Sequence, residues 1–292
     1  MTKSINAAKL TWLPKKTFQL EFSLPWTEVK KTYDLVVDQL VKTAKIEGFR
    51  PGKAPKDLVE KSADKGRLYG EVINQLLPIS YAKAISGHQL RPAVSPKVTI
   101  IKAEENQAWE FKAVSCELPE VKLNNYVASV KGALVKSKLW TPDKGDPTKK
   151  EDKELDSTQK LNLISQALIT DTKIDLPDLL IETEADRMLA KLLDQVQKLG
   201  LTIDQYANSN NKTVDQIKTE YHLTAENTLK LELILQAIAE EKNFKVEDKD
   251  IDALINASGD EKIKKQLQAP SERAYISSIL KKRQTIDYLL SL

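Results

Sequence analysis

The chain is divided near its middle by a segment that cannot contribute to a hydrophobic core. Residues 136–156 (KSKLWTPDKGDPTKKEDKELD) contain twelve charged side chains, two prolines and very few apolar side chains. A segment of this composition buries too little apolar surface to offset the entropy lost on ordering. We therefore expect a flexible linker at 136–156 between two domains, at 1–135 and 157–292, because 292 residues are enough for two cores.

The N-terminal part combines strand and helix patterns. Residues 17–24 (TFQLEFSL) alternate apolar and polar side chains, as a half-buried strand requires. At residues 26–45 the apolar side chains recur with helical spacing instead. A small α+β domain that ends near Glu120 would be completed by a strand around 8–13, helices at 57–62 and 68–86, the second kinked by Pro78, and strands at 98–101 and 109–114.

The sequence after the linker shows only helical patterns. Pro177 fits the first turn of a helix that Gly200 would end. Thr-x-x-Gln pairs at 202–205 and 213–216 have the spacing of capping boxes for two further short helices. An apolar run at 229–238 and an amphipathic helix at 271–290 follow. The expected fold class is α+β and mainly helical, with a small N-terminal α+β domain and an all-α body.

Composition excludes several kinds of site. The single cysteine, Cys116, cannot form an intramolecular disulfide, and two histidines are too few for a zinc site with it. Neither His88 nor His222 lies in a nucleophile motif. The chain begins without a signal-peptide pattern and has no apolar run long enough to span a bilayer, so we expect a cytoplasmic protein without a membrane partner.

Two further motifs, for phosphate and for calcium binding, are incomplete in this sequence. The GFRPGK segment is one residue short of a phosphate-binding loop, and Ala54 stands where a magnesium-binding Ser or Thr is needed. Three aspartates at 248, 250 and 252 begin like a calcium loop, but Ala253 replaces the glycine and Gly259 replaces the closing glutamate. These acids favour a helix N-terminus instead. We expect no cofactor and no metal.

The loop GFRPGKAP, at 48–55, is the most informative stretch. Gly48 and Gly52 allow sharp turns, and the prolines stiffen them. The side chains left to project are those of Phe49, Arg50 and Lys53. An aromatic ring between two cations suits a mixed protein and RNA surface. The ring can bury apolar area, and the Arg guanidinium can donate two parallel hydrogen bonds to a phosphate or carboxylate. The alternative is a plain helix connection whose Phe49 packs back into the core. Residues 1–120 carry 19 Lys and Arg against 14 Asp and Glu. This excess of positive charge also favours an anionic partner.

This loop resembles the ribosome-binding signature of the trigger factor family. The similarity includes the LRPAVSP segment and WEFKAVSCELPEVKLNNY, and it resumes at LISQALITDTKIDLPDLLIETEADRMLAKLLDQVQKLG. The resemblance implies an ATP-independent chaperone that binds the large ribosomal subunit, through ribosomal protein and rRNA near the tunnel exit. The ribosome-binding residues would be Gly48, Phe49, Arg50, Pro51, Gly52 and Lys53.

The chain departs from the family pattern in two places. Pro51 stands where many members have lysine, so one charge contact is missing, and Lys42, Lys45 and Lys53 could compensate. In the family an isomerase domain of the FKBP type lies between the two parts, but here only the charged linker occupies that position. About twenty residues cannot form such a domain, so we expect no enzyme activity by that route.

The helical body would bind nascent or unfolded polypeptides. Apolar residues facing a cleft would form the binding surface, with Met188, Leu192 and Tyr275 as candidates, whereas the run at 229–238 favours a buried central helix. An exposed apolar cleft would also allow a homodimer off the ribosome. Three alternatives stay open: a ribosome-independent holdase or assembly chaperone, a prolyl isomerase as in other family members, and an RNA-binding protein, although the patterns of the usual RNA-binding modules are absent.

Overall fold

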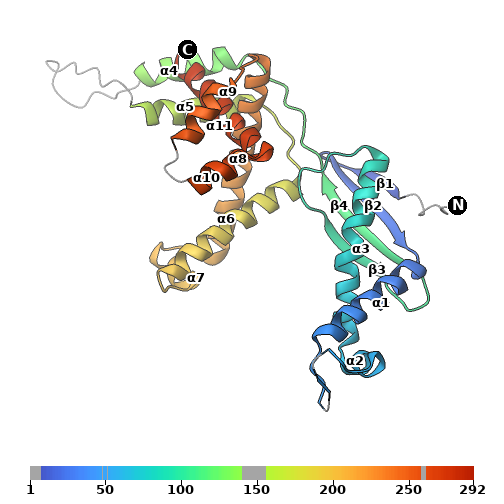
Figure 1. Cartoon of the computed structure of the whole chain (residues 1–292). Helices are drawn as coiled ribbons and strands as arrows, with labels where there is room; N and C mark the ends of the chain where they lie inside the picture. The colour runs from blue at the N-terminus through green and yellow to red at the C-terminus, as the bar shows by residue number, and fades with distance from the viewer. Residues whose placement is uncertain (1–7, 48, 51, 140–155, 258–260) are drawn as a thin grey trace. The chain divides into compact units, whose positions relative to one another are not determined.

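A computed structural model describes residues 8–47, 49–50, 52–139, 156–257 and 261–292 (Figure 1). Contacts between Cα atoms divide the chain into two compact units, residues 1–118 with 177–180, and residues 119–176 with 181–292. The predicted linker falls mainly on residues 140–155, which lie outside the described residues. Its bounds, and those of the predicted domains, therefore stay predictions.

The first unit is an antiparallel sheet with helices on one face. The strands are β1 (Lys9–Leu13), β2 (Thr17–Leu24), β3 (Lys97–Lys102) and β4 (Trp109–Cys116), in the order β1-β2-β4-β3. The helices are α1 (Trp26–Thr43), α2 (Lys56–Ser62) and α3 (Lys65–His88). The strands and helices predicted here are confirmed. Pro78 lies inside α3, which is assigned as one helix, and the kink stays a prediction.

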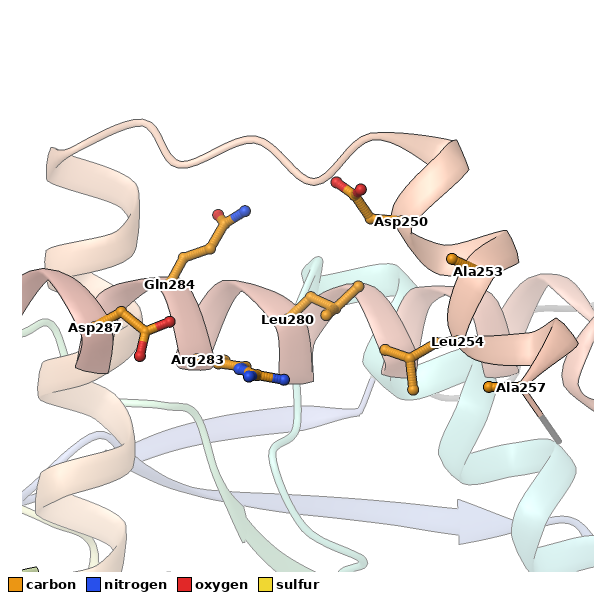
Figure 2. Close-up of a pocket in the computed structure, with 8 residues that line it drawn as sticks. All are labelled: Asp250, Ala253, Leu254, Ala257, Leu280, Arg283, Gln284 and Asp287. Carbon is orange, nitrogen blue, oxygen red and sulfur yellow. The ribbon is translucent and has the colours of Figure 1, made fainter. Parts of the chain in front are cut away.

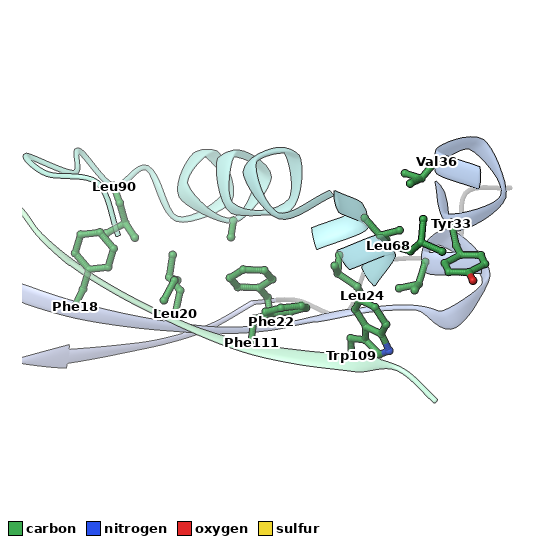
Figure 3. Packing of buried hydrophobic residues seen from close by; sticks show 14 of the residues in the cluster. Phe18, Leu20, Phe22, Leu24, Tyr33, Val36, Leu68, Leu90, Trp109 and Phe111 are labelled. Atoms are coloured by element: carbon green, nitrogen blue, oxygen red, sulfur yellow. The ribbon is translucent and has the colours of Figure 1, made fainter. Parts of the chain in front are cut away.

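A single aromatic core holds this unit together. Figure 3 shows Phe18, Leu20 and Phe22 in a row along β2, facing the helices. These side chains are at most 6% exposed, and the rings of Phe22 and Phe111 stack at 5.9 Å between centroids. Each such side chain stabilises the folded state by roughly 1.5–3 kcal/mol through removal from water. The alternation of β2 therefore fixes which face of the sheet the helices cover.

The turn between β1 and β2 has an unusual backbone. Lys15 and Lys16 have φ angles of 57° and 53°, and the Thr17 amide donates to the Pro14 carbonyl at 3.2 Å. Two consecutive positive φ angles define the hairpin turn that matches the twist of a sheet, and Asn-Gly is its usual sequence. Two lysines in this conformation carry backbone strain.

The outer strand β3 is irregular. Its pairing with β4 shifts between Ile100 and Lys102, which leaves Ile101 as a bulge. Ile100 and Ile101 are 50% and 54% exposed. A bulge bends the strand and interrupts the row of backbone groups along its outer edge.

The second unit is helical. Its helices are α4 (Tyr126–Leu139), α5 (Ser157–Asp171), α6 (Asp178–Lys198, from Ile181 onward), α7 (Ile203–Ser209), α8 (Val214–Glu241), α9 (Asp248–Asn256), α10 (Glu261–Leu267) and α11 (Pro270–Leu290). The overall class is α+β and mainly helical, as predicted. No described helix is long and apolar enough to cross a membrane.

The capping boxes before α7 and α8 are confirmed, with both reciprocal hydrogen bonds formed at Thr202 and at Thr213. The predicted short helix after Thr213 is wrong, however, because α8 continues to Glu241 and includes the apolar run. The sequence between these residues contains no glycine or proline that would end it. The run is buried as predicted, at Leu233, Ile234, Leu235 and Ile238.

Candidate docking loop and apolar surfaces of the helical unit

The loop between α1 and α2 extends beyond both helices, away from the sheet (Figure 1). Helix α1 ends where the Ala44 amide donates to the Leu40 carbonyl at 2.8 Å. The loop then contains two local turns, in which the amide of Phe49 donates to Ile46 at 3.1 Å and that of Lys53 donates to Arg50 at 2.9 Å. Each of these turns is closed by one backbone hydrogen bond.

The backbone at the base of this loop requires a glycine at position 52. Its φ is +78°, and a Cβ atom there would lie 2.9 Å from the Lys42 carbonyl oxygen. Its amide donates to the Ala44 carbonyl at 3.4 Å. No side chain fits this position without a shift of the backbone. The glycine predicted from sequence therefore closes the loop against the end of α1.

The loop presents an aromatic ring and cations to solvent. Phe49 is 42% exposed, so its ring is not part of the core, and Arg50 and Lys53 are exposed as well. Lys42 and Lys45 are also exposed, and none of these four cations forms an ion pair with any described residue. Gly48 and Pro51 lie outside the described residues. The loop thus combines apolar area with uncompensated positive charge.

A cavity of about 590 Å³ lies at the base of the loop. Its walls come from the end of α1, from α2 and from the start of α3, and the buried side chains of Val36, Val59 and Leu68 line it. Lys45 and Ile46, which lead into the loop, line it as well. Sequence periodicity could not reveal this cavity, because it depends on how three helices meet.

The predicted client-binding residues differ in their exposure. Tyr275 on α11 is 63% exposed, and Met188 on α6 is half-buried. Leu192 is 6% exposed and packs in a small core with Val196 and Ile217. Leu192 is therefore a core residue of this unit and offers almost no surface to a client.

Other apolar side chains of the helical unit are exposed as well, and Leu199 is more exposed than any of these candidates. Leu199 is 74% exposed, and Leu201 and Leu223 are 39% and 57% exposed. Gly200, with φ +73°, ends α6 in a turn where the Leu201 amide donates to the Val196 carbonyl at 3.1 Å. In the sequence, the glycine of the Leu-Gly-Leu triplet predicts the end of the helix, but helical periodicity does not indicate that its leucines are exposed.

A second apolar surface lies between α9 and α11. Figure 2 shows Leu254 and Leu280 pointing toward one another across a depression of about 470 Å³, with Asp250 and Gln284 beside it. Leu254 is 48% exposed. The predicted acidic start of α9 is confirmed, and Arg273 from α11 pairs with Asp248 at 2.9 Å.

The described residues do not form a metal-binding cluster. No group of three or more His, Cys, Asp or Glu side chains among them could hold a metal ion. Cys116 is fully buried, which raises its thiol pKa to about 11. His88 hydrogen-bonds the Ala8 carbonyl at 2.7 Å, and His222 is exposed.

Comparisons with known proteins agree with this architecture. The chain matches the model of the bacterial trigger factor protein at residues 7–137 and that of the bacterial trigger factor C-terminus at residues 146–291. Trigger factor from Mycolicibacterium smegmatis is 34% identical over 105 residues, 36% of this chain and 22% of that protein. Trigger factor from Moorella thermoacetica is 37% identical over 114 residues, 39% of this chain and 26% of that protein.

The aligned part of the chain thus spans about a quarter of the length of these curated relatives. A solved structure from a study of promiscuous substrate recognition in folding and assembly by the trigger factor chaperone has the same fold. It superposes with a TM-score of 0.58 at 13% identity, over 97% of this chain and 99% of that one. Together with the two family models, which account for most of the sequence, these similarities show that the chain belongs to the bacterial trigger factor family.

Proposed function

We propose that this protein is an ATP-independent chaperone that docks on the large ribosomal subunit and binds nascent or unfolded polypeptides. The exposed loop carries the proposal, because Phe49, Arg50 and Lys53 project from a base that Gly52 closes. The ring would bury apolar area on ribosomal protein, while the two cations contact rRNA phosphates. Gly48 and Pro51 belong to the same proposed contact by family resemblance.

Co-sedimentation with ribosomes at low and moderate salt tests the docking. We expect the variant Phe49→Ala, Arg50→Ala, Lys53→Ala to lose binding. Each phosphate contact contributes a slope of about −0.7 to −0.9 in log affinity against log salt, so removal of the two cations should flatten the salt dependence by roughly 1.5. Ile79→Ala, Lys83→Ala, Arg91→Ala is a matched control, since it removes an exposed aliphatic side chain and two cations from elsewhere in the unit. Equal binding by both variants would contradict the docking site.

The helical unit is proposed to bind clients by weak and reversible apolar burial. At about 25 cal/mol per Å², a few exposed side chains give modest affinity after the entropy of association is subtracted. Met188, Tyr275 and Leu199 are the candidate contacts. Suppression of aggregation of a chemically unfolded client should fall in a Leu199→Ser, Tyr275→Ser variant, while ribosome binding stays unchanged. Full suppression by this variant would place the client surface elsewhere.

We also propose that this chain does not catalyse prolyl isomerisation. The two family-model matches leave only residues 138–145 between them, which is too short for a domain of the FKBP type. A proline-limited refolding assay should show no acceleration. Acceleration that persists in repurified protein would restore the enzyme alternative.

The remaining parts of the proposal are a cytoplasmic location, large-subunit partners at the tunnel exit, and a homodimer off the ribosome. The second candidate function is a ribosome-independent holdase or assembly chaperone. Suppression of client aggregation without any ribosome co-sedimentation would favour it.

A further inference from the structure

Strand β1 forms one edge of the sheet, beyond β2 (Figure 1). Its five residues pair one to one with β2, from Lys9 opposite Glu21 to Leu13 opposite Thr17. Among the described strands β1 pairs with β2 alone, and each of its residues except Leu10 is exposed. The outer side of such a strand presents backbone N–H and C=O groups that can pair with a further strand.

The two edges of this sheet differ in regularity. The pairing of β3 with β4 shifts between Ile100 and Lys102, whereas the pairing of β1 with β2 keeps one register over its whole length. A further strand pairs best with an edge whose N–H and C=O groups follow in regular order. β1 is therefore the edge at which this sheet can be extended.

The side chains of β1 leave apolar area uncovered on both faces of the sheet. Trp12 lies opposite Phe18, and the two rings meet edge to face at 5.8 Å between centroids, yet Trp12 stays 50% exposed. Leu13 points to the opposite face and is 39% exposed. A strand added beyond β1 would cover these side chains as well as pair with the backbone.

We propose that the β1 strands of two copies of this chain pair antiparallel about a two-fold axis at Thr11, which joins the two four-stranded sheets edge to edge. In this register Thr11 lies opposite the partner's Thr11, Leu10 opposite the partner's Trp12, and Lys9 opposite the partner's Leu13. The two residues of each pair are an even number of positions apart in the strand, so both point to the same face of the joined sheet.

The side-chain pairs of this register are the reason that a second copy fits the edge. The axis repeats the pair of Leu10 with the partner's Trp12, so both exposed indole rings are covered, and a Thr–Thr pair lies at the centre. Lys9 faces a leucine rather than another lysine, and its ammonium lies 3.9 Å from Glu21 of its own chain. Like charges therefore do not face one another within the paired strands.

The dimer is weak, because two five-residue strands bury far less than the roughly 800 Å² per partner of a stable interface. It therefore dissociates on dilution. The inference rests on the part of the proposed function that assigns a homodimer off the ribosome, and it names the surface of that homodimer.

Sedimentation equilibrium of the full chain between about 1 μM and 1 mM tests the interface. We expect the wild type to pass from monomer to dimer over this range. Thr11→Lys sets two ammonium groups directly opposite one another at the axis, so association should weaken roughly tenfold or more. Thr11→Glu should do the same. An equal mixture of the two variants sets lysine opposite glutamate and should associate at least as tightly as the wild type.

Thr99→Lys is the matched control, because Thr99 is an exposed threonine of β3, the other edge strand. It should leave association unchanged, and thermal unfolding should show that every variant is folded. Thr11→Cys gives a second readout, since opposite residues of antiparallel strands have Cα atoms about 4.5–5.5 Å apart, which a disulfide can span. Oxidised glutathione should link two copies of Thr11→Cys but not of Thr99→Cys, and the native Cys116 is fully buried.

A wild type that stays monomeric at about 1 mM, or a dimer that Thr11→Lys leaves intact, would overturn the inference. Failure of the mixed variants to associate would overturn it too. A monomeric wild type whose suppression of client aggregation is lost in Thr11→Lys would assign this edge to extended client segments instead of a second copy. Ribosome co-sedimentation and suppression of aggregation by the wild type decide the proposed chaperone function separately, so the chain could lose this interface and keep that function.

Discussion

The sheet unit and the helical unit are stabilised in different ways. The sheet unit has one continuous core of fifteen buried residues, which includes Phe18, Phe111 and Trp109. The helical unit also buries side chains of α5, α8 and α11, among them Leu168, Ile234 and Leu289. Beside these it has smaller separate clusters, one around Leu192 and another around Ile251. Burial in one large cluster couples many residues, whereas small clusters lie near solvent and can open separately. We therefore expect cooperative unfolding of the sheet unit, and local opening of the small clusters around Leu192 and Ile251 in the helical unit.

The largest expected effect comes from truncating a buried side chain of the sheet core and comparing the loss of stability with that of a truncation in a small helical cluster. Phe111→Ala should cost about 3–5 kcal/mol of unfolding free energy, because the stacked partner Phe22 cannot fill the space. Ile251→Ala in the small cluster should cost about 2 kcal/mol, at the lower end of the usual range. Urea unfolding of both variants measures the difference. Equal losses would mean that the clusters of the helical unit are coupled as tightly as the sheet core.

The next effect compares glycines at three positions. Gly52→Ala combines a positive φ with a 2.9 Å approach to the Lys42 carbonyl, and should cost about 2–3 kcal/mol. Gly200→Ala has a similar φ but open space, and should cost about 1 kcal/mol. Gly132→Ala, in the middle of α4, should stabilise by about 0.5–1 kcal/mol. A harmless Gly52→Ala substitution would show that the loop base is less constrained than its contacts indicate.

A smaller effect concerns the strained hairpin of the sheet unit. Replacing Lys15 and Lys16 by Asn and Gly should stabilise the unit by about 1 kcal/mol, because that pair adopts positive φ angles readily. Thermal unfolding checks this, and Lys30→Asn, Lys31→Gly in α1 is a control that should destabilise. No gain at the hairpin would mean that contacts of the lysine side chains outweigh the strain.

The last effect is an alkaline pH dependence that we expect in the sheet unit. Burial, and then a 2.9 Å hydrogen bond to Glu60, raises the pKa of Tyr33 to about 12. The folded state therefore holds this proton more tightly than the unfolded state, whose tyrosine pKa is about 10. The associated stability is complete below about pH 10 and is lost as the pH rises toward 12.

Urea unfolding at pH 8, 10 and 11 should show a smaller alkaline loss for Tyr33→Phe than for the wild type. Tyr275→Phe, at an exposed position, is the control and should behave as the wild type does. If both variants lost stability in parallel with the wild type, Tyr33 would not be the group that titrates.

Local sequence patterns predict most of the helices and strands, but not which of their side chains are exposed. The alternation of residues 17–24 and the capping boxes at Thr202 and Thr213 gave the correct elements because each is set by neighbouring residues. The sequence pattern does not predict α4, because its apolar stripe is short and weakly amphipathic, with Ala, Ser and Gly among its residues. The exposure of the Phe49 ring and the burial of Leu192 depend on tertiary packing, which sequence periodicity does not indicate.

The bulge at Ile101 has a consequence for solubility. A regular outer strand with exposed isoleucines would offer its free backbone groups to any extended chain nearby, including another copy of the protein. The bulge between Ile100 and Lys102 interrupts that row, and lysines stand at both ends of the strand. The sheet can therefore carry apolar side chains on its outer edge without recruiting extended chains into the sheet.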